Sequence, residues 1–243
     1  MSKLLFLDVE ATGTEKEDRL IQVAYKIEDD QCNKLFKPPV PIKLSAMAVH
    51  HTTEKMVADK EQFSHSQTKE NLLRYNNEGA IFVAHNAKYD LGMLAKEGVV
   101  FNKHICTMKI ARYINSDNRF ENHQMQYLRY FYGIEIEATA HDAFGDILVL
   151  EQVFAKLYDD FVKKEYGNSN GVILDGVLNR MIEISMQPSL MTSFNFGKYN
   201  GKTVEQVASI DRGYLEWLLD MKTQKPEGEE DWIYTLKKVL KKI

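Results

Sequence analysis

The sequence predicts an α/β fold, a mixed five-stranded sheet of three antiparallel and two parallel strands, flanked by helices. Three observations predict it. Strand-like runs at 4–10, 19–28 and 31–39 follow one another with short connections, as in an antiparallel meander. Two further strand-like runs, at 80–86 and 104–107, alternate with helical segments. Sheets that combine these two patterns are usually covered by helices on both faces.

Helices are expected between the later strands and after them. In chain order they lie within 45–77, over 89–96, from 108, from 123 and over 142–166. Ser45, and either Ser64 or Ser66, are candidate N-caps, because serine accepts a hydrogen bond from the first free amides of a helix. Gly98 is expected to end the helix before it.

The chain is expected to divide into three parts. Residues 1–166 form the main α/β domain, and 167–187 form a linker and a connecting helix, because GNSNG at 167–171 has linker composition. Residues 188–243, which open on Pro188, form a small, mostly helical C-terminal domain. Its expected helices lie near 204–210, 213–220 and 232–243.

Composition excludes several classes of protein. With 243 residues and 44% hydrophobic content, the chain can bury a sizeable core. Cys32 and Cys106 are too few for a disulfide framework. No signal peptide and no apolar run of about 20 residues is present, so we expect no membrane span and a cytoplasmic protein. The net charge of −4 is not that of a tight, non-specific nucleic-acid binder.

Acidic side chains follow the predicted strands at three places. Asp8 and Glu10 lie two residues apart, and therefore on one face, at the end of the first strand. Asp90 begins a helix just past the fourth strand, where α/β proteins usually bind ligands. His141 precedes a helix that carries Asp146. Taken singly, each has an ordinary interpretation, as a solvated strand end or a residue at a helix N-terminus.

Together the four carboxylates point to metal chemistry. Two unit charges about 4 Å apart repel by about 4 kcal/mol at an effective dielectric of 20, so four acids at one site need counter-ions. Oxygen ligands select Mg²⁺ or Mn²⁺, and two such ions are a known device for phosphodiester cleavage. A neutral His141 beside the attacking water could take its proton.

Three motifs carry a resemblance to a known family. DVEATG at 8–13, HNAKYDLGML at 85–94 and HDAFGD at 141–146 resemble, in order and spacing, the motifs of the DEDDh exonucleases, which have the RNase H-like fold. The resemblance implies a two-metal phosphodiester hydrolase that acts from 3′ ends. It also implies the site residues, with His141 as general base and four metal ligands: Asp8, Glu10, Asp90 and Asp146.

One position departs from the family pattern. Ala11 stands where the family usually carries threonine after the glutamate. Contacts of this neighbourhood to the 3′ nucleotide are therefore expected from backbone groups of Ala11, Thr12 and Gly13.

A further similarity is to bacterial enzymes of the exonuclease X group, through the segments 45–60, 104–112 and 188–219. It implies a DNA 3′-to-5′ exonuclease that acts on single strands and duplex ends, with a role in repair. The resemblance also places His50 near the terminal nucleotide, and Asn86 is a comparable candidate. For both residues, a purely structural hydrogen-bonding role remains open.

The C-terminal part mixes aromatic and basic residues. FNFGKYNGK interleaves Phe194, Phe196 and Tyr199 with Lys198 and Lys202, as surfaces that stack bases and bind phosphates do. Small domains also need aromatic residues for their cores, and YLEWLL has the spacing of helix packing. Nucleic-acid contact by the two lysines and a core role for the aromatic residues therefore both stay open.

Two other functions are weighed against a DNA exonuclease. The same motifs hydrolyse RNA, so an exoribonuclease is the alternative within the family. A non-catalytic nucleic-acid or polymerase-binding module is the alternative from another class. It is disfavoured because a decayed site has no physical reason to keep four mutually repelling acids.

Overall fold

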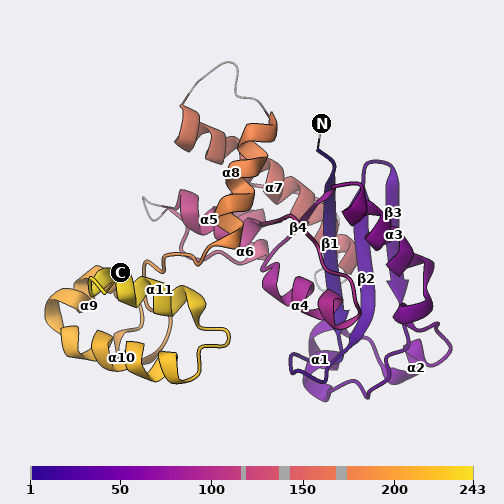
Figure 1. Cartoon of the computed structure of the whole chain (residues 1–243), viewed down its shortest axis with the longest axis horizontal. Helices are drawn as coiled ribbons and strands as arrows, with labels where there is room; N and C mark the ends of the chain where they lie inside the picture. The colour runs from indigo at the N-terminus through magenta and orange to yellow at the C-terminus, as the bar shows by residue number, and fades with distance from the viewer. Residues whose placement is uncertain (1, 116–118, 137–142, 168–173, 243) are drawn as a thin grey trace.

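The computed structural model describes residues 2–115, 119–136, 143–167 and 174–242, which form a layered α/β unit followed by a small helical tail (Figure 1). The strands are β1 (Leu4–Ala11), β2 (Leu20–Ile27), β3 (Asp30–Leu35), β4 (Ile81–Ala84) and β5 (His104–Cys106). They form one sheet in the order β3-β2-β1-β4-β5. The first three are antiparallel, while β4 pairs in parallel with β1 and β5. The predicted mixed sheet is confirmed.

The described helices also follow the expected pattern. They are α1 (Leu44–His50), α2 (Glu54–Val57), the 3₁₀ turn η1 (Phe63–His65), α3 (Gln67–Asn77), α4 (Lys88–Lys96), α5 (Thr107–Ile114), α6 (Met125–Phe131), α7 (Ala143–Tyr166), α8 (Leu174–Met186), the 3₁₀ turn η2 (Gly197–Tyr199), α9 (Val204–Ile210), α10 (Arg212–Gln224) and α11 (Glu230–Val239). Of the candidate caps, Ser66 accepts the Lys69 amide at 3.2 Å and starts α3. In the described part of the chain, none of the helices is long and apolar enough to cross a membrane.

The two faces of the sheet bury different cores, because successive side chains of a strand point to opposite faces. Leu5, Leu7 and Val9 of β1 pack in one cluster with residues of α3 and α4. Phe6, on the other face, packs in a second cluster with residues of α5, α6, α7 and α8. Side chains that alternate in phase with Phe6 therefore point toward α7.

Helix α8 follows the segment expected to be a linker. Its apolar face buries Val177, Leu178, Met181 and Ile182 in the same cluster as α7. Ser185 near its end accepts the backbone amide of β5 residue Cys106 at 2.9 Å. The predicted connecting helix therefore also covers the sheet.

The tail has its own small core. Phe194 and Trp232 stack with ring centroids 4.8 Å apart, and Tyr199 is buried in the same cluster. Leu215 of α10 is buried there as well, as the packing interpretation of YLEWLL predicts. Trp217 differs from that expectation, because it is 56% exposed and lies on the outer side of α10.

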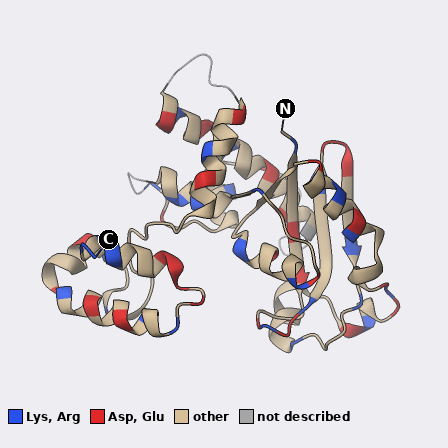
Figure 2. Ribbon diagram, in the orientation of Figure 1, with Lys and Arg blue, Asp and Glu red and all other residues tan. Residues whose placement is uncertain are grey.

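Two ion pairs join the tail to the first unit. Lys88 of α4 pairs with Glu230 at 2.7 Å, and Arg112 of α5 pairs with Asp231 at 2.8 Å. Both acids lie in the first turn of α11. Lysine and arginine are otherwise mixed with aspartate and glutamate over both units (Figure 2). The fold therefore presents charges of both signs throughout, in line with the small net charge.

Candidate active site

Asp8 and Glu10 lie near the C-terminal end of β1. Both are half-buried, and both alternate in phase with Phe6, so their side chains leave the face that packs against α7. The parallel pairing of β1 with β4 ends at Phe6, which pairs with Val83. Past that point, one edge of β1 is open to the loop and helix that follow β4.

Asp90 occupies this open edge. It lies in the first turn of α4 and is 3% exposed. Its Oδ1 accepts the backbone amide of Val9 at 3.2 Å, in place of the partner that a longer β4 would supply. The side chain is thereby fixed beside β1, between Asp8 and Glu10 along the strand.

Asp146 reaches the same region from α7. It lies in the first turn of the helix and is 8% exposed. Its Oδ1 accepts a hydrogen bond from Gln126 Nε2 of α6 at 3.1 Å. His141, the predicted base, lies outside the described residues.

The acids influence one another strongly. Burial raises the pKa of Asp8 well above its usual range, and the charges of Asp90, Glu10 and Asp146 raise it further. Burial, followed by the charge of Asp146, raises the pKa of Glu10 to about 7. Burial also raises the pKa of Asp90, although the amide of Val9 opposes the change. The structure therefore brings the four predicted acids into one electrostatic cluster.

The cluster fits divalent cations by its chemistry. Its donors are all carboxylate oxygens, the ligands that Mg²⁺ and Mn²⁺ prefer. Among the described residues, no lysine or arginine forms an ion pair with Asp8, Glu10 or Asp90. Within the same residues, no three or more His, Cys, Asp or Glu side chains are arranged closely enough to hold a metal ion without moving. Bound cations would supply the positive charge that this cluster needs.

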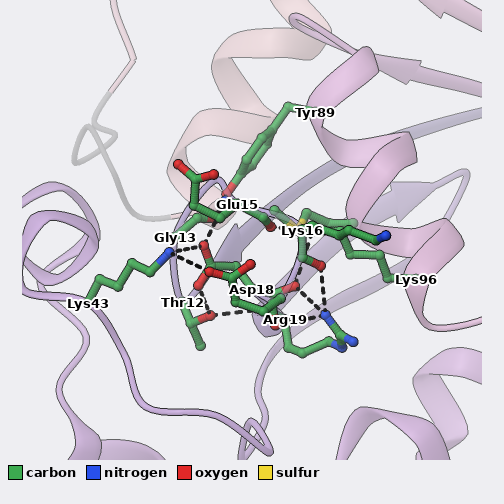
Figure 3. A network of polar contacts seen from close by, with 11 residues as sticks. Thr12, Gly13, Glu15, Lys16, Asp18, Arg19, Lys43, Tyr89 and Lys96 are labelled. Atoms are coloured by element: carbon green, nitrogen blue, oxygen red, sulfur yellow. Dashed lines mark hydrogen bonds and ion pairs between the residues drawn. The ribbon is translucent and has the colours of Figure 1, made fainter. Parts of the chain in front are cut away.

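A tightly built turn follows Glu10. Ala11, Thr12 and Gly13 are all buried, and the Thr12 amide donates to the Arg19 carbonyl at 2.9 Å. The contacts of this backbone with the terminal nucleotide stay a prediction. Asp18, 1% exposed, accepts Thr12 Oγ1 at 2.9 Å, the Glu15 amide at 2.7 Å and Lys43 Nζ at 2.6 Å (Figure 3).

His50 is the last residue of α1, and Asn86 lies just before α4. The ring of His50 is buried, and its Nδ1 accepts the amide of Thr52 at 3.0 Å. Its Nε2 is buried without a hydrogen-bond partner in the described part of the chain. Burial lowers the pKa of His50, and the Ala11 backbone next to it acts in the opposite direction. Asn86 is exposed, with a left-handed φ of 63°.

Lys198 and Lys202 belong to the tail and not to the acidic cluster. Both are exposed. Lys198 pairs with Asp211 at 3.2 Å, and its Nζ lies 4.8 Å from the ring centroid of Tyr199. Because Tyr199 itself is buried, this ring is part of the tail core and is not a free stacking surface.

Sequence reasoning missed several residues that shape this site. Gln126 lies in the helix expected from position 123, but only the structure shows its contact with Asp146. Asp18 closes the acidic run EKED, which reads as a solvated loop. The one available signal was the glycine at position 13 so soon after Glu10, since glycine often marks a close approach of other groups.

The chain is similar to known nucleases in sequence. A family model described as an exonuclease matches residues 5–154. A second, described as the exodeoxyribonuclease X-like C-terminal domain, matches residues 194–220. Exodeoxyribonuclease 10 of Escherichia coli K12 is 32% identical over 191 residues, which cover 76% of this chain and 75% of that protein. A DNA polymerase III subunit epsilon-like protein of Rhodobacter capsulatus is 28% identical over 172 residues, 65% of this chain and 24% of its own length.

Solved structures share the fold. Exonuclease X in complex with 5′ overhanging duplex DNA superposes with a TM-score of 0.54 and 22% identity, over 75% of this chain and 99% of that one. The nuclease domain of 3′hExo, a DEDDh family member bound to rAMP, superposes with a TM-score of 0.52 and 11% identity, over 65% of this chain and 92% of that one. The predicted RNase H-like fold is confirmed.

Proposed function

Because this chain belongs to the exonuclease family, we propose that it is a metal-dependent 3′-to-5′ exodeoxyribonuclease. It hydrolyses terminal phosphodiesters of single-stranded DNA and duplex ends and releases nucleoside 5′-monophosphates. The observation that carries the proposal is the clustering of four interacting acids from β1, α4 and α7, of which Asp90 and Asp146 are buried and Asp8 and Glu10 half-buried. The names of two relatives, an exodeoxyribonuclease and an exonuclease in complex with duplex DNA, favour DNA as the substrate. We also propose a role in DNA repair.

We assign the metal-ligand role to Asp8, Glu10, Asp90 and Asp146. Two Mg²⁺ or Mn²⁺ ions bound there would supply an activated water and charge stabilisation for the leaving oxygen. Asp90 is held in place by the Val9 amide, and Asp146 is held by Gln126. His141 accepts the proton of the attacking water as the general base.

The terminal nucleotide is assigned to the edge beside this cluster. The backbone of Ala11, Thr12 and Gly13 is assigned to it because these residues directly follow Glu10 along the chain. Two further candidates for the nucleotide are the Nε2 of His50, which has no hydrogen-bond partner among the described residues, and the exposed amide of Asn86. Contacts with phosphates farther along the strand are assigned to the exposed Lys198 and Lys202 of the tail.

The domain division stays as predicted. Residues 1–166 form the catalytic domain, 167–187 the linker and connecting helix, and 188–243 the small C-terminal domain. The two family matches, at 5–154 and 194–220, support this division because they fall on either side of the linker. We also keep the cytoplasm as the proposed location, since Cys32 and Cys106 are both free thiols.

A labelled-strand assay tests the function directly. Single-stranded DNA and RNA of one sequence, labelled at the 5′ end, are incubated with Mg²⁺, Mn²⁺ or EDTA and resolved on a denaturing gel. We expect metal-dependent shortening from the 3′ end that is faster on DNA. Asp8→Asn and His141→Ala should abolish it, while the exposed Glu61→Gln serves as the matched control. Faster loss of RNA would indicate the exoribonuclease.

No cleavage with either metal would indicate the binding module instead. Calorimetry with Mn²⁺ distinguishes an exonuclease from a binding module, because a site without catalytic function does not need to bind the ions. Binding of Mn²⁺ to the wild type, lost in Asp8→Asn, is the expected result.

A further inference from the structure

The buried carboxylate of Asp18 takes no part in the proposed chemistry, although it lies next to the end of β1. A buried charge is unfavourable unless it is paired and hydrogen-bonded, and Asp18 meets both conditions through Thr12, Glu15 and Lys43. The three donors hold the pKa of Asp18 below its usual range against the opposing effect of burial. The site is therefore built to keep Asp18 ionised and fixed.

The backbone of Gly13 packs directly against this carboxylate. A Cβ atom at position 13 would lie 2.5 Å from Asp18 Oδ2, 2.8 Å from Asp18 Cγ and 2.8 Å from Lys43 Cδ. No side chain larger than hydrogen fits there without displacing the ion pair. The turn and the Asp18–Lys43 pair thus form one packed unit. Figure 3 shows Thr12, Asp18 and Lys43 joined by hydrogen bonds and the ion pair.

The same unit is tied to the helix that carries His50. Lys43 is the N-cap residue of α1, and its backbone amide donates to the Thr12 carbonyl at 3.0 Å. Through its side chain it binds Asp18 at 2.6 Å. Two contacts of one lysine therefore set α1 against the turn.

It is also tied to the helix that carries Asp90. Lys96 Nζ at the end of α4 donates to the Glu15 carbonyl at 2.7 Å and to the Asp18 carbonyl at 3.2 Å. Tyr89, which precedes Asp90, donates its hydroxyl to the Gly13 carbonyl at 3.4 Å. The turn therefore has fixed contacts with both elements that flank the acidic cluster.

We propose that Asp18 is a positioning residue for substrate binding. It holds the Thr12–Gly13 turn in register with α1 and α4, which carry His50 and Asp90, and so fixes the edge at which the 3′-terminal nucleotide binds. Asp18 itself touches neither the metal ligands nor the reacting atoms. The proposal rests on the function proposed above, because it needs the terminal nucleotide to bind at this edge.

The proposal predicts a specific kinetic pattern. Asp18→Asn keeps the size of the side chain but loses the charge that binds Lys43. A turn displaced by about 1 Å can reduce activity by as much as about 100-fold, and we expect about a 10-fold rise in KM for single-stranded DNA. The kcat value should change less than about threefold, and Mn²⁺ affinity by calorimetry should stay unchanged, because the four acids are untouched.

Three further variants test the same proposal, so that it does not depend on the folding of Asp18→Asn alone. Lys43→Met should reproduce the rise in KM. Lys43→Arg keeps the charge, so its KM should stay at the wild-type value. Gly13→Ala should raise KM by its clash with the carboxylate. Asp59→Asn is the matched control, since Asp59 is an exposed acid paired with Lys60 at 3.1 Å.

Equilibrium binding of a fluorescent oligonucleotide in Ca²⁺ gives a second readout that does not need turnover. Weaker binding in Asp18→Asn, Lys43→Met and Gly13→Ala, with wild-type Mn²⁺ affinity, supports the proposal. Unchanged KM and Kd in folded variants overturn it, as does a loss of Mn²⁺ affinity alongside DNA affinity, which indicates a general structural role. Failure of the proposed function is distinct, because the wild type itself then lacks cleavage and Mn²⁺ binding.

Discussion

Glu10 allows the proposed metal site to be tested without any nucleic acid. Its pKa is raised from 4.5 to about 7, mainly by burial and then by the charge of Asp146. A carboxyl group that is harder to ionise in the folded protein than in the unfolded chain opposes folding wherever it is charged. In the metal-free protein, Glu10 should therefore reduce stability at alkaline pH.

The sign and size follow from the two pKa values. Below about pH 4.5 Glu10 is protonated in both states and has no effect. As the pH rises to about 7 and beyond, ionisation costs the folded state up to about 3 kcal/mol. Glu10→Gln removes this charge. We expect the variant to match the wild type near about pH 4 and to be more stable by up to about 3 kcal/mol near about pH 8.

The assay is urea unfolding in EDTA across this pH range, followed by circular dichroism. Glu61→Gln, at an exposed position, is the control and should show no such trend. Adding Mn²⁺ at about 1,000 times its Kd for the wild type should reverse the order, because a ligand at that concentration stabilises the protein that binds it by about 4.1 kcal/mol. If Glu10→Gln is no more stable than the wild type at alkaline pH without metal, the electrostatic reasoning is wrong.

Further predictions concern other parts of the molecule. Gln126→Leu removes the hydrogen bond to Asp146 and should weaken Mn²⁺ binding about 10-fold by calorimetry; equal affinity would show that the contact is dispensable. Phe194→Ala opens the stack with Trp232 and should destabilise the tail by about 3 to 5 kcal/mol, seen as early cleavage of the tail in limited proteolysis while Mn²⁺ affinity is retained. Activity should rise between about pH 6 and about pH 8.5 as His141 loses its proton, and a flat profile contradicts its role as base.

The sheet was predictable because its signal is local. Runs of buried apolar residues such as those of β1 and β4 are visible in the sequence, and their short connections leave few possible topologies. The acids were predictable for a related reason. Asp8 and Glu10 must share a face of a strand, and Asp90 must follow the end of another.

Other features depend on contacts between distant parts of the chain and leave no such trace. Nothing in the sequence near Gln126 indicates that its amide meets Asp146, because the contact depends on how α6 packs beside α7. In the sequence, Asp18 is one acid of a charged loop, and nothing indicates its ion pair with Lys43, which lies 25 residues away. Trp217 has the spacing of a core residue, yet the small tail core is filled by other side chains and leaves it outside.

The short length of β4 has a consequence for how the site should be inactivated. Because β4 stops pairing at Phe6, Asp90 serves two purposes, as a proposed ligand and as the acceptor for the Val9 amide. Asp90→Ala would therefore leave a backbone donor of β1 without a partner and disturb the strand that carries Asp8 and Glu10. Asp90→Asn keeps an oxygen for that amide and removes only the charge. A catalytically dead enzyme that still holds its DNA-binding shape is better made with the asparagine.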